Sequence, residues 1–296
     1  MKLSEVLLLI LLAAIWGSSF IFMRATVTDF GPVFLITLRV GVASLCLLGF
    51  LLLSKNLVEF KRYWKTLFWI GLLNSALPFV LLAYASIFLN AGVVSILNAI
   101  TPIFTAFIGY MWLKDKMTHL QFLGMFIGLL GVVFLVWDKI NWQIHSWLPV
   151  IAGVGATLAY GIAANSTKKY LKGVSAMTAT AGSLFFATLF LLPLSFFFLP
   201  DFSAISALSW SYAIALAVLC TAFAYVIFFR LIQSIGPAKA VSVTFLIPIF
   251  SFVWAYLLLG EVVTNRMWLA TIVILFGTAL VAGVIKKPRS KSQSFF

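Results

Sequence analysis

The chain has 296 residues, of which 64% are hydrophobic and only 9% are charged, and its mean hydropathy is +1.15. An ordinary soluble domain has roughly 25% charged residues, so this composition excludes a soluble enzyme, a disordered tail and a nucleic-acid-binding module. The formal net charge of +13 is therefore informative about membrane topology rather than about a polyanionic partner.

The chain divides into ten apolar runs, each close to the roughly 20 residues that an α-helix needs to cross a bilayer core. In chain order they span residues 4–24, 32–53, 67–88, 91–112, 119–137, 147–166, 175–198, 209–231, 237–258 and 266–285. The first run carries Trp16 and lacks a convincing cleavage site, which favours a membrane helix over a signal peptide. The sequence thus predicts an all-α integral membrane protein with ten transmembrane helices.

The basic residues gather on one side of these predicted spans. The opposite side has only Arg24, Lys139 and Arg266. The side of the N-terminus has the larger set, which comprises Lys2, Lys55, Lys61, Arg62, Lys65, Lys114, Lys116, Lys168, Lys169, Lys172, Lys286, Lys287, Arg289 and Lys291. The positive-inside rule then predicts a multi-pass protein of the cytoplasmic membrane with both termini in the cytoplasm, which requires an even number of spans.

The two halves of the chain resemble each other after a shift of about 146 residues. The matched segments are Pro102-Ile103-Phe104 with Pro248-Ile249-Phe250, Asp115 with Glu261, Trp16-Gly17 with Tyr160-Gly161, and Arg24 with Lys168. Each predicted half holds five helices, an odd number, so the second half enters the membrane from the opposite side. We therefore expect two inverted five-helix repeats, residues 1–140 and 141–285, and a basic cytoplasmic tail over residues 286–296. Such symmetry is typical of secondary transporters.

Two segments, Ala85–Val136 and Leu231–Ala282, each carry Pro-Ile-Phe, an acidic residue after the fourth helix of the half, and a glycine-bearing fifth helix. Together with the Trp16-Gly17-Ser18-Ser19-Phe20 run and Leu38-Arg39, they resemble the EamA repeat of the drug/metabolite transporter superfamily. The resemblance covers nearly the whole chain and implies a ten-helix inverted-repeat carrier for small metabolites or drugs, often an exporter. The Leu113-Lys114-Asp115 loop departs from the usual Leu-Gly-Glu of the family, and this leaves the substrate open.

Polar and aromatic residues near the middle of the predicted spans are the candidate substrate contacts, because a polar group in hydrocarbon is costly unless it is paired or faces water. We expect Trp16 and its repeat counterpart Tyr160 to form opposing walls of one central cavity, although an interfacial or packing role is the alternative. The further candidates are Ser19, Asn74, Tyr84, Asn98, Tyr225 and Thr244.

Two prolines inside predicted spans are candidate hinges. Proline removes a backbone hydrogen bond and can free the carbonyl four residues earlier. Those carbonyls belong to Asn98 before Pro102 and to Thr244 before Pro248. We expect a hinge or a substrate contact at both places, while satisfaction of the freed groups by neighbouring helices stays open.

Arg39 is the one basic residue that falls well inside a predicted span. It could hold a substrate carboxylate through a bidentate pair, or its long side chain could reach the outer interface instead. Gly124, Gly128 and Gly131 permit close helix packing, which fits either a homodimer or contacts within one chain.

The acidic residues all fall at or near predicted helix ends, and so do His119 and His145. A proton relay in the membrane is therefore not supported. The phosphate-binding pattern of ATPases is lacking, and Cys46 and Cys220 have no metal-site or disulfide spacing, so we expect no cofactor and no metal.

The expected function is a secondary transporter, of the export type, that moves a small metabolite or drug such as an amino acid or amphipathic compound by alternating access. Its expected partners are the small-molecule substrate and the lipid bilayer, without nucleic acid. The alternatives are a polytopic membrane enzyme, which would need convergent catalytic groups, and a passive pore, which would need a continuous polar stripe. We expect no catalytic residue.

Overall fold

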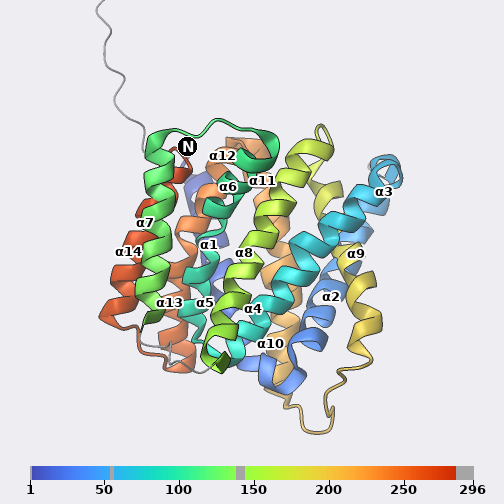
Figure 1. The fold of residues 1–296 in the computed structure, drawn as a ribbon. Helices are drawn as coiled ribbons and strands as arrows, with labels where there is room; N and C mark the ends of the chain where they lie inside the picture. The colour runs from blue at the N-terminus through green and yellow to red at the C-terminus, as the bar shows by residue number, and fades with distance from the viewer. Residues whose placement is uncertain (1, 54–56, 138–143, 285–296) are drawn as a thin grey trace, which may run out of the picture.

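The computed structural model describes residues 2–53, 57–137 and 144–284. Over these residues the chain is helical and contains no strand, which confirms the predicted all-α class. The helices run side by side between two ends of the molecule (Figure 1). The predicted tail over residues 286–296, and also Lys55, Asp138 and Lys139, lie outside the described residues.

The helices follow the predicted apolar runs in order. They are α1 (Leu3–Phe30), α2 (Pro32–Leu53), α3 (Leu57–Gly71), η1 (Leu72–Ala76), α4 (Leu77–Phe88), α5 (Ala91–Asn98), α6 (Thr101–Leu113), α7 (His119–Val136), α8 (Ile144–Tyr170), α9 (Ala176–Ser195), α10 (Ala207–Ala217), η3 (Val218–Phe223), α11 (Ala224–Ile235), α12 (Pro237–Ala240), η4 (Val241–Phe245), α13 (Ile247–Leu259) and α14 (Asn265–Val281).

Within the described ranges, eight helical stretches are long and apolar enough to cross a membrane, and two shorter apolar helices, α13 and α14, follow them. Every predicted run overlaps one of these stretches or helices. One large difference in boundaries is in the third run, where the helix begins at Leu57 rather than at residue 67. The extra turns carry exposed Lys61 and Arg62, while Phe60 on their other side stacks on Phe186 of α9. A helix can continue beyond an apolar run in this way because one of its faces stays packed.

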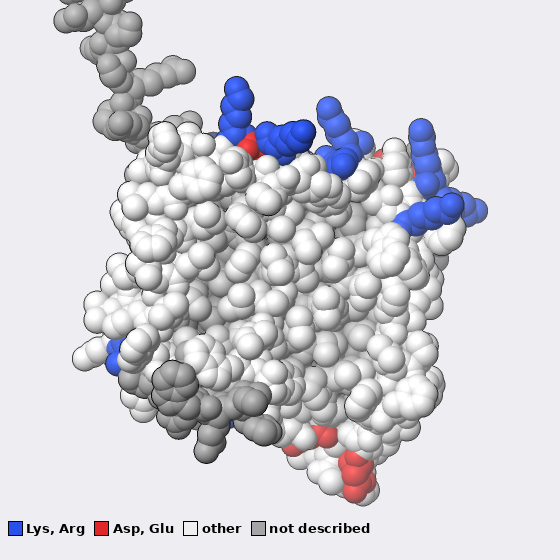
Figure 2. All heavy atoms as spheres, viewed as in Figure 1, with Lys and Arg blue, Asp and Glu red and all other residues white. Residues whose placement is uncertain are grey.

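Basic side chains mark one end of the molecule, which we call the basic end. It carries the N-terminus of α1, and its exposed members include Lys61, Arg62, Lys65, Lys114, Lys116, Lys168, Lys169 and Lys172. Figure 2 shows a broad band free of charged side chains between these residues and the opposite end, where acidic side chains are visible. We call that second end the far end.

Regular helix geometry is interrupted at equivalent places in the two halves. The π-helices η1 and η3 begin at Leu72 and Val218, which are 146 residues apart. The two prolines also lie at equivalent places. The candidate hinges Pro102 and Pro248 are each in the first turn of a new helix, α6 and α13. The first turn tolerates proline because its backbone donors have no partner within the helix.

Glycines allow the closest helix approaches. A Cβ atom built at Gly277 of α14 would lie 2.5 Å from the carbonyl oxygen of Gly124 and 2.5 Å from the nitrogen of Gly128 in α7. The glycine-rich face of α7 is therefore used within the chain, where α7 and α14 lie side by side (Figure 1). Gly17 approaches Phe250 and Gly161 approaches Phe104 in the same manner, at positions that the repeat makes equivalent.

Candidate functional site

The first aromatic contact across the two halves joins α1 to α11. Trp16 lies near the middle of α1, and its ring meets that of Tyr225 edge to face with a centroid distance of 6.1 Å. Phe228 lies against the same indole at 5.2 Å. Edge-to-face packing is a favourable geometry for aromatic rings, because the positive edge of one ring faces the negative face of the other.

A second aromatic contact joins α8 to α4. Tyr160 meets Phe79 at a centroid distance of 6.3 Å and an interplanar angle of 65°. A shift of 146 residues takes Phe79 to Tyr225, and a shift of 144 takes Trp16 to Tyr160. The two ring pairs therefore occupy equivalent positions, and each pairs the first helix of one half with the third span of the other.

Arg39 lies between these two pairs. Its side chain is buried, with 7% of the residue exposed, and its Nε donates a hydrogen bond to the Thr221 hydroxyl at 2.9 Å. Its guanidinium carbon is 4.0 Å from the centre of the Phe79 ring, and the charge is within electrostatic reach of the Tyr160 and Tyr225 hydroxyls. Arg39 thus points into the bundle rather than toward the outer interface, which had been the alternative.

The π-helix η3 explains how Thr221 can accept this bond. The Thr221 hydroxyl donates its own proton to the carbonyl of Leu216, five residues earlier, at 2.9 Å. A π-helix brings that carbonyl into reach, since its hydrogen bonds span five residues. The hydroxyl oxygen is left with free lone pairs, one of which accepts from Arg39.

The other predicted site residues lie at separate places on the helices. Ser19 is buried one turn after Trp16 and donates to its carbonyl at 2.8 Å. Asn74 lies within η1. Tyr84 packs on Phe88 near the end of α4, so it does not join the described contacts of the central cluster.

The residues four positions before the two prolines differ in how their polar groups are hydrogen-bonded. The carbonyl of Asn98 accepts a hydrogen bond from the Thr101 hydroxyl at 2.7 Å, so it has a partner within its own chain. The side-chain oxygen of Asn98 is buried and has no partner within the described chain. Helix α5, which ends at Asn98, packs against both α1 and α8, the helices that carry Trp16 and Tyr160. Thr244 lies in η4 and donates to the carbonyl of Val241.

One ion pair joins the halves at the far end. Arg24 of α1 lies 3.8 Å from Glu261, which follows α13, and its Nη1 donates to the carbonyls of Ser86 and Ile87 at 2.6 and 2.7 Å. Glu261 also accepts from the backbone amide of Ala91 at 3.0 Å. These contacts tie α1, α4, α5 and the end of α13 together.

A second ion pair joins the halves at the basic end. Lys168 of α8 contacts Asp115, which follows α6, at 2.7 Å. Arg24 and Lys168 are equivalent under the repeat, and so are Glu261 and Asp115. The residue before each acid adopts the left-handed conformation, with φ values of 57° at Lys114 and 63° at Gly260.

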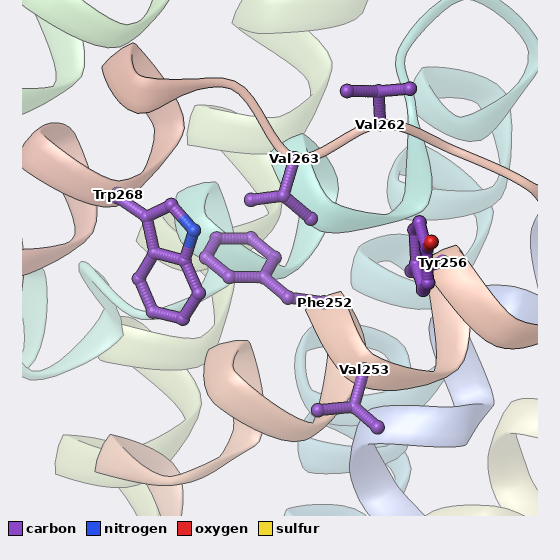
Figure 3. Close-up of a pocket in the computed structure, with 6 residues that line it drawn as sticks. All are labelled: Phe252, Val253, Tyr256, Val262, Val263 and Trp268. Atoms are coloured by element: carbon purple, nitrogen blue, oxygen red, sulfur yellow. The ribbon is translucent and has the colours of Figure 1, made fainter.

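Two surface cavities lie elsewhere, next to α14. The first has a volume of about 290 Å³ and is lined by Phe252, Val253, Tyr256, Val262, Val263 and Trp268 (Figure 3). Its Phe252 and Trp268 rings meet edge to face at 5.0 Å. The second, of about 230 Å³, is lined in part by Asn90 and Arg266. Neither is lined by a predicted site residue.

The described residues contain no group of three or more histidine, cysteine, aspartate or glutamate side chains that could hold a metal.

Sequence reasoning missed Phe79 as a member of the cluster. Phe79 is apolar and resembles the other phenylalanines of the spans, of which the chain has many. The signal that could have found it is the repeat itself, because the candidate Tyr225 stands 146 residues after Phe79.

The long apolar helices define a multi-pass membrane protein whose centre holds aromatic rings and a buried cation. The model of the EamA-like transporter family matches the chain twice, over residues 3–137 and 147–283. The chain therefore belongs to the EamA-like transporter family.

Several curated relatives match over most of their length. The chain is 26% identical to the uncharacterized transporter YoaV of Bacillus subtilis over 89% of this chain and 91% of that one. It is 27% identical to the uncharacterized inner membrane transporter YedA of Escherichia coli, covering 90% and 87%, and 25% identical to Protein PagO of Salmonella typhimurium, covering 94% and 93%. One crystal structure superposes with a TM-score of 0.69 at 12% identity, over 98% of this chain and 100% of that one, which shows a shared fold alone.

Proposed function

We propose that the chain is a secondary transporter that exports a small metabolite or drug, such as an amino acid or amphipathic compound, across the cytoplasmic membrane by alternating access. In this proposal ten transmembrane helices form two inverted five-helix repeats, and both termini lie in the cytoplasm. The two successive matches of the family model support the repeats. The exposed lysines and arginines of the basic end support the orientation.

The observation that carries the proposal is the pairing of equivalent contacts at opposite ends. Arg24 with Glu261 and Lys168 with Asp115 each link one half to the other. Inverted repeats can exchange conformations, so that opening at one end accompanies closing at the other. We assign the two ion pairs as the contacts that close the far end and the basic end in turn.

The aromatic pairs lie between these two closures and serve as the walls of the substrate site. Trp16 with Tyr225 and Tyr160 with Phe79 present ring faces and two hydroxyl groups. Aromatic walls with a few polar groups are typical of sites for small molecules.

Counterflow in proteoliposomes tests the proposal. The vesicles are loaded with pools of amino acids, other organic carboxylates, nucleosides, polyamines, aromatic amines and uncharged amides, and uptake of labelled members is followed above that of protein-free vesicles. Saturable exchange of at least one pool is expected, and it should not respond to a pH gradient. Lack of exchange of every pool would contradict the transporter proposal.

A further inference from the structure

Arg39 brings a positive charge into the middle of the bundle, where both of its described partners are neutral. One is the Thr221 hydroxyl, and the other is the face of the Phe79 ring. The hydrogen bond uses Nε, and no hydrogen bond joins the terminal nitrogens, Nη1 and Nη2, to another residue in the described ranges. The end of the guanidinium that carries Nη1 and Nη2, which can form two parallel bonds to a carboxylate, is therefore left without a hydrogen-bond partner in the described part of the chain.

The acidic groups of the chain do not supply the missing negative charge. In the part of the chain that the structure describes, every carboxylate has a hydrogen bond or ion pair at a helix end or in a connecting loop, and none has a described contact with Arg39. These are Glu5, Asp29, Glu59, Asp115, Asp201 and Glu261. The seventh acid, Asp138, lies outside the described residues, after α7.

An arginine stays charged in a protein, and a buried charge without a counter-charge is costly. A hydroxyl and a ring face offset only part of that cost. The repeat does not require the charge either, since the residue 146 positions after Arg39 is Phe185. The cation is thus a single, asymmetric addition to an otherwise paired aromatic site.

We propose that Arg39 receives the carboxylate of the transported molecule, so that the substrates are small organic carboxylates with an apolar or aromatic body. Thr221 holds the guanidinium by Nε and leaves Nη1 and Nη2 to form two parallel bonds to the carboxylate. The rings of Trp16, Tyr160 and Tyr225 surround the apolar body. This inference rests on the proposed transport function, and it adds the charge of the substrate.

The experiment compares three matched pools in counterflow: aromatic and aliphatic carboxylates, the amides of the same acids, and the amines of the same length. Wild-type protein is expected to exchange the carboxylates and neither of the other pools. Arg39→Gln should raise the half-saturating carboxylate concentration by about 10- to 100-fold, the range typical of a lost hydrogen bond to a charged group. Arg39→Lys should recover part of the loss, because it keeps the charge without the planar fork.

The outcomes separate the two claims. Exchange of amides or amines in place of carboxylates would overturn the inference about Arg39 while the transporter proposal stands. Exchange of carboxylates with unchanged half-saturation in Arg39→Gln would overturn it as well. Lack of exchange of all pools would contradict the transporter proposal itself, and the inference with it.

A second pair of variants covers the case in which Arg39→Gln does not fold. Thr221→Val removes the hydroxyl that orients the guanidinium, whereas Ser75→Ala removes the equivalent hydroxyl in the first half, which has no arginine partner. Half-saturation by carboxylates should rise severalfold in Thr221→Val and stay unchanged in Ser75→Ala. Thermal unfolding of the wild-type protein should also shift upward with the carboxylates and not with the amides, and equal shifts with both pools would overturn the inference.

Discussion

At the far end of the bundle Arg24 pairs with Glu261, and at the basic end Lys168 pairs with Asp115. The side chains of the first pair are 31% and 14% exposed, and those of the second are 60% and 44% exposed. Arg24 also bonds two backbone carbonyls, and Glu261 also bonds a backbone amide. The Lys168 pair has the shorter distance, but solvent and salt screen such an exposed pair, which is typically worth about 0–1 kcal/mol.

The difference follows from the residues themselves. The guanidinium of arginine has five donors in a fixed plane, so Arg24 can bond several acceptors at once, whereas the ammonium of lysine acts as a compact point charge. The contacts of Arg24 and Glu261 therefore hold the two halves together more firmly than those of Lys168 and Asp115. We infer that, in the proposed transport cycle, the basic end opens more easily than the far end.

The largest expected effect concerns the aromatic pairs midway between the two ends. Trp16→Ala and Tyr160→Ala should each abolish saturable exchange, because each removes one wall of the site, while the amount of protein inserted in the membrane stays normal. Trp69→Ala is the matched control, since that indole is 60% exposed on the surface of α3. Normal transport by both site variants would contradict the placement of the substrate site between these aromatic rings.

Removing each ion pair in turn tests whether the contacts at the far end stabilise the protein more than those at the basic end. Arg24→Gln should lower the free energy of unfolding by about 2–3 kcal/mol, because it removes several charge-assisted bonds in a partly buried place. Lys168→Gln should lower it by less than about 1 kcal/mol. Thermal unfolding in detergent measures both, and equal losses would contradict the comparison.

Adding a methyl group at the close helix crossings should lower the stability of the protein by similar amounts in the two halves. A Cβ at Gly161 would lie 2.9 Å from the backbone of Phe104, and one at Gly17 would lie 2.8 Å from the Cβ of Phe250. Gly161→Ala and Gly17→Ala should each cost about 1–3 kcal/mol of stability through overpacking. Gly155→Ala, on the same helix as Gly161, is the control because its nearest neighbour is at 3.6 Å. Unchanged stability in Gly161→Ala would contradict this expectation, because it would show that α8 can shift away from α6 at little cost in free energy.

The smallest expected effect is a change in unfolding temperature, with opposite signs at two equivalent positions. Lys114 and Gly260 both adopt the left-handed conformation, which costs a residue with a Cβ roughly 1 kcal/mol. Lys114→Gly should therefore raise the unfolding temperature, and Gly260→Ala should lower it. Lys114→Ala shortens the side chain without relieving the backbone, so it separates this effect from the loss of charge.

The all-α class and the approximate places of the helices could be predicted from the sequence, because apolar runs are visible in the order of residues along the chain. The start of α3 at Leu57 could not, since its charged turns break the apolar run while Phe60 still packs. The π-helices η1 and η3 also escaped prediction, because a shift in backbone hydrogen bonding has no signature in residue type.

The candidate site could be predicted in part. Trp16, Tyr160 and Tyr225 stood out as polar aromatic residues near the middle of spans, and the structure brings them together around Arg39. Which face of a helix meets which neighbour depends on tertiary packing, so the Thr221 partner of Arg39 and the end position of Tyr84 were not evident. The roles of these residues in transport stay predictions.

The chemical accessibility of Cys220 shows whether the two ends of the bundle open in turn onto one site. This thiol is 1% exposed and lies within electrostatic reach of Arg39, and the chain has only one other cysteine, Cys46, which Cys46→Ser removes. An impermeant maleimide is applied from one side of the membrane and then from the other. We expect Arg24→Gln to speed labelling from the far end and slow it from the basic end, and Lys168→Gln to do the reverse. Faster labelling from the same side in both variants, or no change in either, would contradict the account.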